Sequence, residues 1–238
     1  MRGIVPVAVF IALLLQAAPA LAQEDALRAM TEMEFVDFLR QYRDPASHVV
    51  TAGTGAAPHR GKCGFGVMSE AARRLEIASP AAAADIRTLL APKARQTSIY
   101  SPSGRFRIFY DTSGTDAAAL LTGDTARIPN SAHAFAQVVA EVFDSVYQVE
   151  VIDIGYMAPP FEETQSTYNI SVTEFNGDPY GQTLFNLPLP SSGTVRPTYA
   201  CRMEIDNDFL EFETRGLNGL RVTAAHEFHH MVQLGSYG

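Results

Sequence analysis

The stretch "LRVTAAHEFHHMVQ", residues 220–233, sets the fold expected for the rest of the chain. Its apolar residues recur at the spacing of a helix with one buried face: Ala224, Phe228, Met231 and Val232. His226 and His230 lie four residues apart and project from the opposite side. The stretch therefore predicts a helix, starting at about Leu217, that buries one face and presents two histidines on the other.

The motif His-Glu-x-x-His in this helix is typical of a catalytic zinc site. Zinc in a hydrolase is bound by neutral imidazoles on one side and keeps an open position for water on the other. His226 and His230 are therefore expected to bind Zn²⁺. Glu227 is expected to be the general acid/base, taking a proton from the metal-activated water and passing it to the leaving amine.

A third protein ligand to the zinc is not visible in the motif. The metzincin form of the site requires Gly at 233 and His at 236, where this chain has Gln233 and Ser236. The motif therefore favours the gluzincin form, in which a Glu from a later helix, here beyond Gly238, completes the site. We expect a sequence truncated before that ligand to be inactive as a protease. His229 is expected at the cleft edge or on the surface, outside the metal shell.

The elements before this helix indicate the α+β class. "GRFRIFYDTSG" alternates as a strand, and a helix with one apolar face begins at Asn130 or Ser131. "VEVIDIGY", "TYNISVTEF" and "TYACRMEIDNDF" are expected to be further strands. Residues 99–238 are thus predicted to form a zincin-like N-terminal half-domain, with a mixed sheet, a backing helix and the His-Glu-x-x-His helix.

Residues 23–98 are predicted to form a mostly helical lead-in or pro-segment. "EDALRAMTEMEFVDFLRQYRD" has apolar residues at helical spacing. Two further short helices are expected on either side of Pro80, with Ser79 available to cap the second.

Residues 1–22 are typical of an export signal. Arg2 precedes an apolar run from Ile4 to Leu15, and Ala20-Leu21-Ala22 matches a signal peptidase site. The run is too short to span a bilayer, so we expect a secreted or periplasmic protein with no membrane anchor. The formal net charge of −8 argues against nucleic acid or an anionic membrane as a partner.

The two cysteines, Cys63 and Cys201, allow two interpretations. An exported chain favours a disulfide between them, which would connect the lead-in to the later domain. The alternative comes from "HRGKCGFG" around Cys63, which resembles the cysteine switch of matrix metalloprotease propeptides, where a thiolate caps the zinc.

Several segments together resemble a family of exported bacterial zinc metalloproteases known from myxobacteria. They are "SPSGRFRIFYDTSG", the helix ending near Gln148, "VEVIDIGYMAPP", "IDNDF" and "LRVTAAHEFHHMVQ". The resemblance runs from about Lys62 to the end and implies zinc ligands at His226 and His230, with the acid/base at Glu227. It also implies a third ligand in a later helix that contains a Glu motif.

The acidic stretch "EIDNDF", residues 204–209, has two interpretations. Asp206 and Asp208 offer the oxygen ligands that a structural Ca²⁺ prefers. A solvated turn, in which Asp side chains accept hydrogen bonds from nearby backbone N–H groups, is the favoured interpretation.

These observations lead to two hypotheses on function. The first is a secreted zinc endopeptidase that aligns a peptide or protein substrate along an edge strand and hydrolyses it with Glu227 as acid/base. The alternative is an exported, non-catalytic binding or adhesion module on a zincin scaffold. Glu227 favours the first, because a non-catalytic module has no chemical need for a carboxylate beside its metal.

Overall fold

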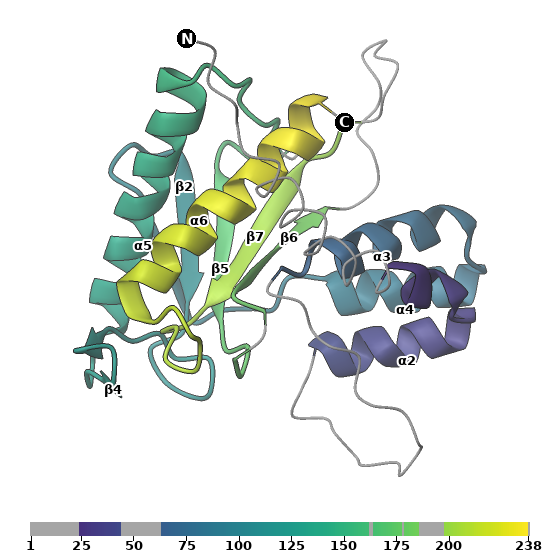
Figure 1. Cartoon of the computed structure of the whole chain (residues 1–238), viewed down its shortest axis with the longest axis horizontal. Helices are drawn as coiled ribbons and strands as arrows, with labels where there is room; N and C mark the ends of the chain where they lie inside the picture. Colours follow the sequence, from purple (N-terminus) through teal and green to yellow (C-terminus); the bar gives the residue numbers. More distant parts are fainter. Residues whose placement is uncertain (1–23, 44–62, 162–163, 178, 186–197, 238) are drawn as a thin grey trace, which may run out of the picture.

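In the described part of the chain, the helices of the lead-in precede a mixed β-sheet, and the last long helix carries the two histidines (Figure 1). The computed structural model describes residues 24–43, 63–161, 164–177, 179–185 and 198–237. The α-helices are α2 (Glu32–Arg43), α3 (Phe65–Ile77), α4 (Pro80–Leu90), α5 (Ala132–Tyr147) and α6 (Gly216–Val232). The sheet strands are β1 (Thr97–Tyr100), β2 (Phe106–Tyr110), β5 (Tyr168–Thr173), β6 (Gly181–Phe185) and β7 (Cys201–Asp206). Two-residue strands β3 (Leu121–Thr122) and β4 (Ala126–Arg127) form a separate ribbon, and π-helices η2 (Gln148–Asp153) and η3 (Gln233–Tyr237) extend α5 and α6.

The five strands are ordered β1-β2-β5-β7-β6. The central strands β2, β5 and β7 are parallel, and both outer strands run antiparallel to their neighbours. Helices α5 and α6 lie together on one face of this sheet (Figure 1). Phe106 of β2, Phe143 of α5 and Phe228 of α6 are fully buried where these layers meet. The predicted α+β class with a mixed sheet is confirmed.

Helix α6 forms as its apolar spacing predicts. It begins at Gly216, one residue before the expected start. The four residues predicted for its buried face are all 1% exposed or less: Ala224, Phe228, Met231 and Val232. Burying these side chains holds α6 on the sheet, so the histidine side of the helix has a fixed direction.

The lead-in is helical, as predicted, but its first helical region is divided. Residues 24–29 form a short helix, and α2 starts again at Glu32. The break is a capping box, because Thr31 N–H donates to Glu34 Oε2 (2.7 Å) and Glu34 N–H donates to Thr31 Oγ1 (3.3 Å). Ser79 caps α4 as expected, accepting from Ala82 N–H at 3.4 Å.

Buried arginine contacts attach the lead-in to the sheet face opposite α6. Arg43, at the end of α2, donates to both carboxylate oxygens of Glu204 on β7, one bond being 2.9 Å long. Arg202 on the same strand donates to the carbonyl of Leu90 at the end of α4. Side chains alternate along a strand, so Met203 and Ile205 face the other way, towards the core. The lead-in is thus part of the folded core.

Two predictions about strands differ from the structure. Residues 149–156 were expected to be a strand, but α5 continues into η2, and Val149, Ile152 and Ile154 are exposed. Glu150 is the buried residue of η2, and its Oε2 lies 3.2 Å from His229 Nδ1. Strands β1 and β6 were not expected, nor was the two-residue ribbon of β3 and β4.

Some predictions concern residues outside the described part of the chain. The export signal, residues 1–22, lies there, as do His48 and His59. None of the helices that the structure describes has both the length and the apolar character needed to cross a bilayer.

Candidate metal and catalytic site

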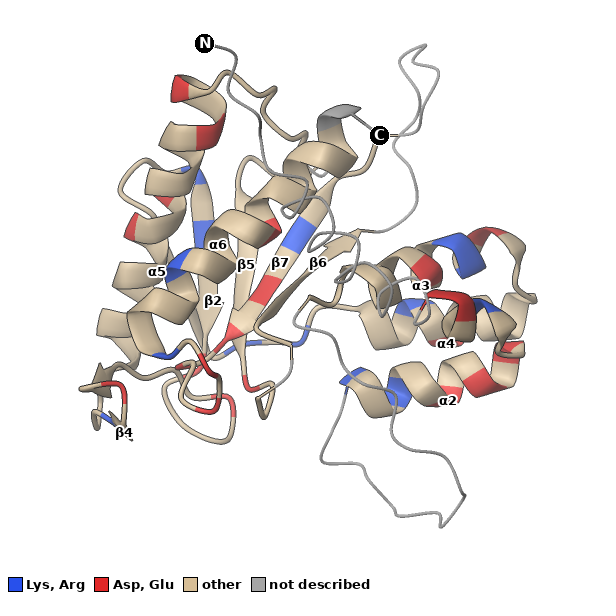
Figure 2. Cartoon of the chain, in the orientation of Figure 1, with Lys and Arg blue, Asp and Glu red and all other residues tan. Residues whose placement is uncertain are grey.

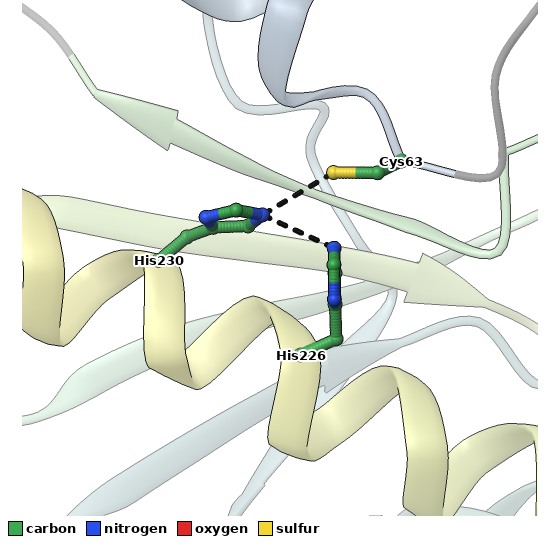
Figure 3. A group of neighbouring side chains, drawn as sticks. All are labelled: Cys63, His226 and His230. Carbon is green, nitrogen blue, oxygen red and sulfur yellow. Dashed lines mark hydrogen bonds between the residues drawn. The ribbon is translucent and has the colours of Figure 1, made fainter. Parts of the chain in front are cut away.

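Three metal-ligating side chains from distant parts of the sequence meet above α6 (Figure 3). His230 Nε2 lies 3.1 Å from His226 Nε2 and 3.3 Å from Cys63 Sγ. All three donor atoms lie within 4.8 Å of one another. The helix places the two imidazoles one turn apart on one face, as predicted, and the lead-in brings the thiol to the same point.

His230 is held in the orientation and proton state that a metal ligand needs. Its Nδ1–H donates to Gln233 Oε1 at 3.2 Å, which leaves the Nε2 lone pair directed at the cluster. The Phe65 ring stacks on the imidazole, with centroids 4.2 Å apart and planes at 11°. Burial, with His226 nearby, lowers the pKa of His230 to about 4. The imidazole is therefore neutral at neutral pH.

Glu227 is buried beneath the cluster and is 1% exposed. Its Oε2 accepts a hydrogen bond of 2.8 Å from Thr183 Oγ1 on β6. Burial raises the pKa of Glu227 to about 7, against the smaller opposing effect of Thr183. A carboxyl group with a pKa near neutrality is suited to take up and return a proton.

Strand β6 passes unusually close to α6 at Gly181. A Cβ built on this glycine would lie 2.6 Å from Thr223 Cγ2 and 3.2 Å from Glu227 Cγ. Beside this contact is a pocket of about 280 Å³, lined among others by Tyr180, Val222 and Glu227. Only a residue without a side chain allows the edge strand and helix α6 to approach this closely.

Gly181→Ala is therefore expected to destabilise the protein by about 1–3 kcal/mol, because the added methyl group overpacks the contact with α6. The urea-unfolding midpoint measures this effect. Gly66→Ala in α3 is the matched control, since no atom lies within 4 Å of its added Cβ. Equal midpoints for the two variants would show that the β6–α6 contact is looser than described.

The predicted disulfide between Cys63 and Cys201 is wrong for this structure, because neither cysteine is bridged. Cys201 is buried in β7, opposite Phe185 of β6. Cys63 instead forms a bridge beside Gly181, on the outer side of β6, and points at His230. Burial, with a smaller effect of Glu227, raises the pKa of the Cys63 thiol to about 12.

The other histidines in the described residues lie outside the cluster. His229, although adjacent to His230, contacts Glu150 Oε2 through Nδ1 at 3.2 Å and lies edge-on to Tyr156. This agrees with the expectation that His229 is not a metal ligand. His133 pairs through Nδ1 with the Tyr110 hydroxyl at 2.8 Å.

The carboxylate oxygens of Asp206 are used by the backbone. Oδ1 accepts from the N–H groups of Asp208 (3.0 Å) and Phe209 (2.6 Å), and Oδ2 accepts from Phe175 N–H (3.1 Å). Acidic residues gather around this end of β7 (Figure 2). Burial, with Glu174 nearby, raises the pKa of Asp206 to about 7. These contacts favour the turn over a Ca²⁺ site at Asp206 and Asp208.

The structure adds Thr183 and Gln233 to the predicted site, and of the two interpretations of Cys63 it favours the one that places the thiol there. Thr183 bonds Glu227, Gln233 orients His230, and Cys63 supplies a donor atom. Gln233 was recognisable as a residue on the cleft side of α6. Thr183 carried no signal, because its role depends on strand pairing with β7. The third ligand expected beyond Gly238 stays a prediction.

Comparisons with protein-family models, with curated proteins and with solved structures found no significant match.

Proposed function

We propose that this protein is a secreted zinc endopeptidase in which His226 and His230 hold the metal and Glu227 is the general acid/base. The observation that carries the proposal is the combination of two converging imidazole Nε2 atoms with a buried carboxyl group on the same helix. Zinc at this position supplies Lewis-acid activation of water and of a substrate carbonyl.

The donor set fits zinc. Both imidazoles present Nε2 to one point, and His230 has a supporting partner for its other nitrogen. Neighbouring side chains exclude enough water to lower the pKa of His226, and His229 adds to the effect. Neutral imidazoles at near-tetrahedral sites are the usual ligands of catalytic zinc, whereas Ca²⁺ and Mg²⁺ prefer oxygen.

Glu227 is the group that moves protons in this proposal. Its pKa near 7 lets it hold or release a proton at physiological pH. Thr183 fixes the direction of the carboxyl group from the neighbouring strand. Burying the charged form of Glu227 costs folding free energy. A carboxyl group placed in the interior at such a cost supports a chemical role for Glu227.

The sheet edge provides a way to bind an extended peptide. β6 is the outer strand of the described sheet on the side of the cluster, and its outer backbone groups lie beside Cys63 and the pocket. An extended peptide added to such an edge gains main-chain hydrogen bonds, and its alternate side chains enter adjacent pockets.

The experiment that tests this proposal is a zinc titration of the purified chain, with His226→Ala, His230→Ala and the control His133→Ala. We expect about one tightly bound zinc per chain in the wild type and in His133→Ala. Each ligand variant should lose at least about 100-fold in affinity, since loss of even a supporting partner costs about 10–100-fold. Zinc binding that is undiminished in both ligand variants would end the proposal.

A further inference from the structure

We propose that Cys63 is a third protein ligand to the metal, and that it latches the site shut until the segment carrying it is withdrawn. This inference rests on the proposed zinc site and concerns its regulation. It begins from the position of Sγ, 3.3 Å from His230 Nε2 and within 4.8 Å of His226 Nε2. A thiolate and two imidazoles form a donor set typical of zinc.

Two contacts of Phe65 fix the position of the Cys63 sulfur beside His230. The Phe65 N–H, at the first residue of α3, donates to Cys63 Sγ at 3.3 Å. The Phe65 ring also stacks on His230, so this one residue contacts both the donor atom and a ligand ring. A hydrogen bond to sulfur orients a metal-bound thiolate in the way that supporting contacts orient other ligands.

The backbone around Cys63 is tightly seated. A Cβ on Gly64 would lie 2.8 Å from Gln182 Cβ and 2.7 Å from Tyr42 Oη. The glycine is therefore needed for the segment to reach β6. Earlier in the lead-in, the buried contact of Arg43 with Glu204 holds the helices on the sheet. The thiol is thus positioned by the fold of the whole lead-in.

Cys63 also stands where an extended substrate would lie. It forms a parallel bridge with Gly181 on the outer side of β6 and lines the pocket next to Glu227. A peptide cannot pair with this part of the edge strand while Cys63 occupies it. Cys63 therefore prevents the substrate backbone from pairing with β6. It also occupies the coordination position of the metal that the attacking water needs.

The chemistry of the latch is a ligand exchange. When the thiol binds the metal, its proton passes to solvent and the sulfur forms a bond to the metal in place of a water molecule. Withdrawal of the segment breaks that bond, returns a proton to the sulfur and lets water take the position. No oxidant or reductant takes part.

Cobalt(II) is the probe for ligation, because a thiolate ligand gives a charge-transfer band in the near ultraviolet. The chain is titrated with Co²⁺ as wild type, Cys63→Ser and the control Cys201→Ala. We expect the band in the wild type and in Cys201→Ala, and its loss in Cys63→Ser together with at least about tenfold weaker binding. Cobalt bound by the wild type without the band, or a band that persists in Cys63→Ser, would overturn the inference.

Cleavage of unfolded casein tests the latch, with the zinc-loaded protein produced from its complete gene so that the ligand expected beyond Gly238 is present. We expect Cys63→Ser to cleave at least about tenfold faster than the wild type, because loss of the sulfur ligand leaves a metal position open for water. A Cys63→Ser variant that keeps its zinc but cleaves no faster would overturn the latch. Failure of every variant to bind metal would instead contradict the proposed function, so the two failures are distinguishable.

Discussion

Replacing Glu227 by glutamine is expected to lower the rate of casein cleavage by about 10²–10⁴-fold while leaving zinc bound. The amide keeps the shape of the side chain beside Thr183 but takes up no proton, so the acid/base contribution to catalysis is lost. The comparison is made in the wild-type and Cys63→Ser backgrounds, with zinc content measured in each. A glutamine variant that cleaves at the parent rate would remove Glu227 from the mechanism.

The same substitution has a predicted effect on stability that does not depend on activity. Burial raises the pKa of Glu227 to about 7, above the ordinary value of 4.5, so the folded state favours the protonated form. The stabilising contribution of protonated Glu227 is therefore present below the unfolded pKa and is lost as pH rises through about 7. The metal-free Glu227→Gln variant should match the wild type near pH 4 and be more stable than it at pH 8. Urea unfolding at the two pH values measures the difference.

The second large effect is expected at the contact between the lead-in and the sheet. Arg43→Met is expected to destabilise the protein by about 3–5 kcal/mol, because it leaves the carboxylate of Glu204 buried without its cation. Arg40→Met is the matched control in the same helix. Its ion pair with Asp37 is exposed, so the change should cost less than about 1 kcal/mol. Equal urea midpoints for the two variants would contradict the description of this contact.

The buried pair also predicts a dependence on pH. Burial alone raises the pKa of Glu204, but Arg43 and the hydrogen bonds from Arg43 and Gln182 outweigh it and hold the pKa at about 2. The stabilisation is therefore present above the unfolded pKa and is lost as pH falls towards about 2. Arg43→Met should lose less stability than the wild type over this range, which acid titrations of unfolding measure.

The parts of the fold that the sequence predicted are those with a local cause. Helix α6 follows from the spacing of Phe228 and Met231 with their neighbours, and α4 follows from Ser79 and Pro80. The two histidines of the site share a face for the same reason.

The remaining features depend on contacts between distant residues. β6 was missed because Gln182 and Thr183 are buried polar residues, which donate hydrogen bonds to Glu204 and Glu227 and break the apolar pattern of a strand. Residues 149–156 were assigned as a strand because no local signal shows that Glu150 is buried against His229. Such pairings become visible only when the chain is folded.

The position of Cys63 is the third such case. The expected export of the chain favoured a disulfide with Cys201, but α3 and the edge of β6 direct the thiol to His230. The cysteine switch interpretation rested on the residues around Cys63. The 3.3 Å separation of Cys63 Sγ from His230 Nε2 supports it independently.

The most direct test of the account is the zinc K-edge X-ray absorption spectrum of the full chain loaded with one equivalent of zinc. The account predicts imidazole nitrogen at about 2.0 Å together with one sulfur at about 2.3 Å. A spectrum with imidazole nitrogen but no sulfur would contradict only the role of Cys63 and would leave the zinc site standing. A shell of oxygen only, or a spectrum unchanged when His226 and His230 are both replaced by alanine, would contradict the zinc site itself.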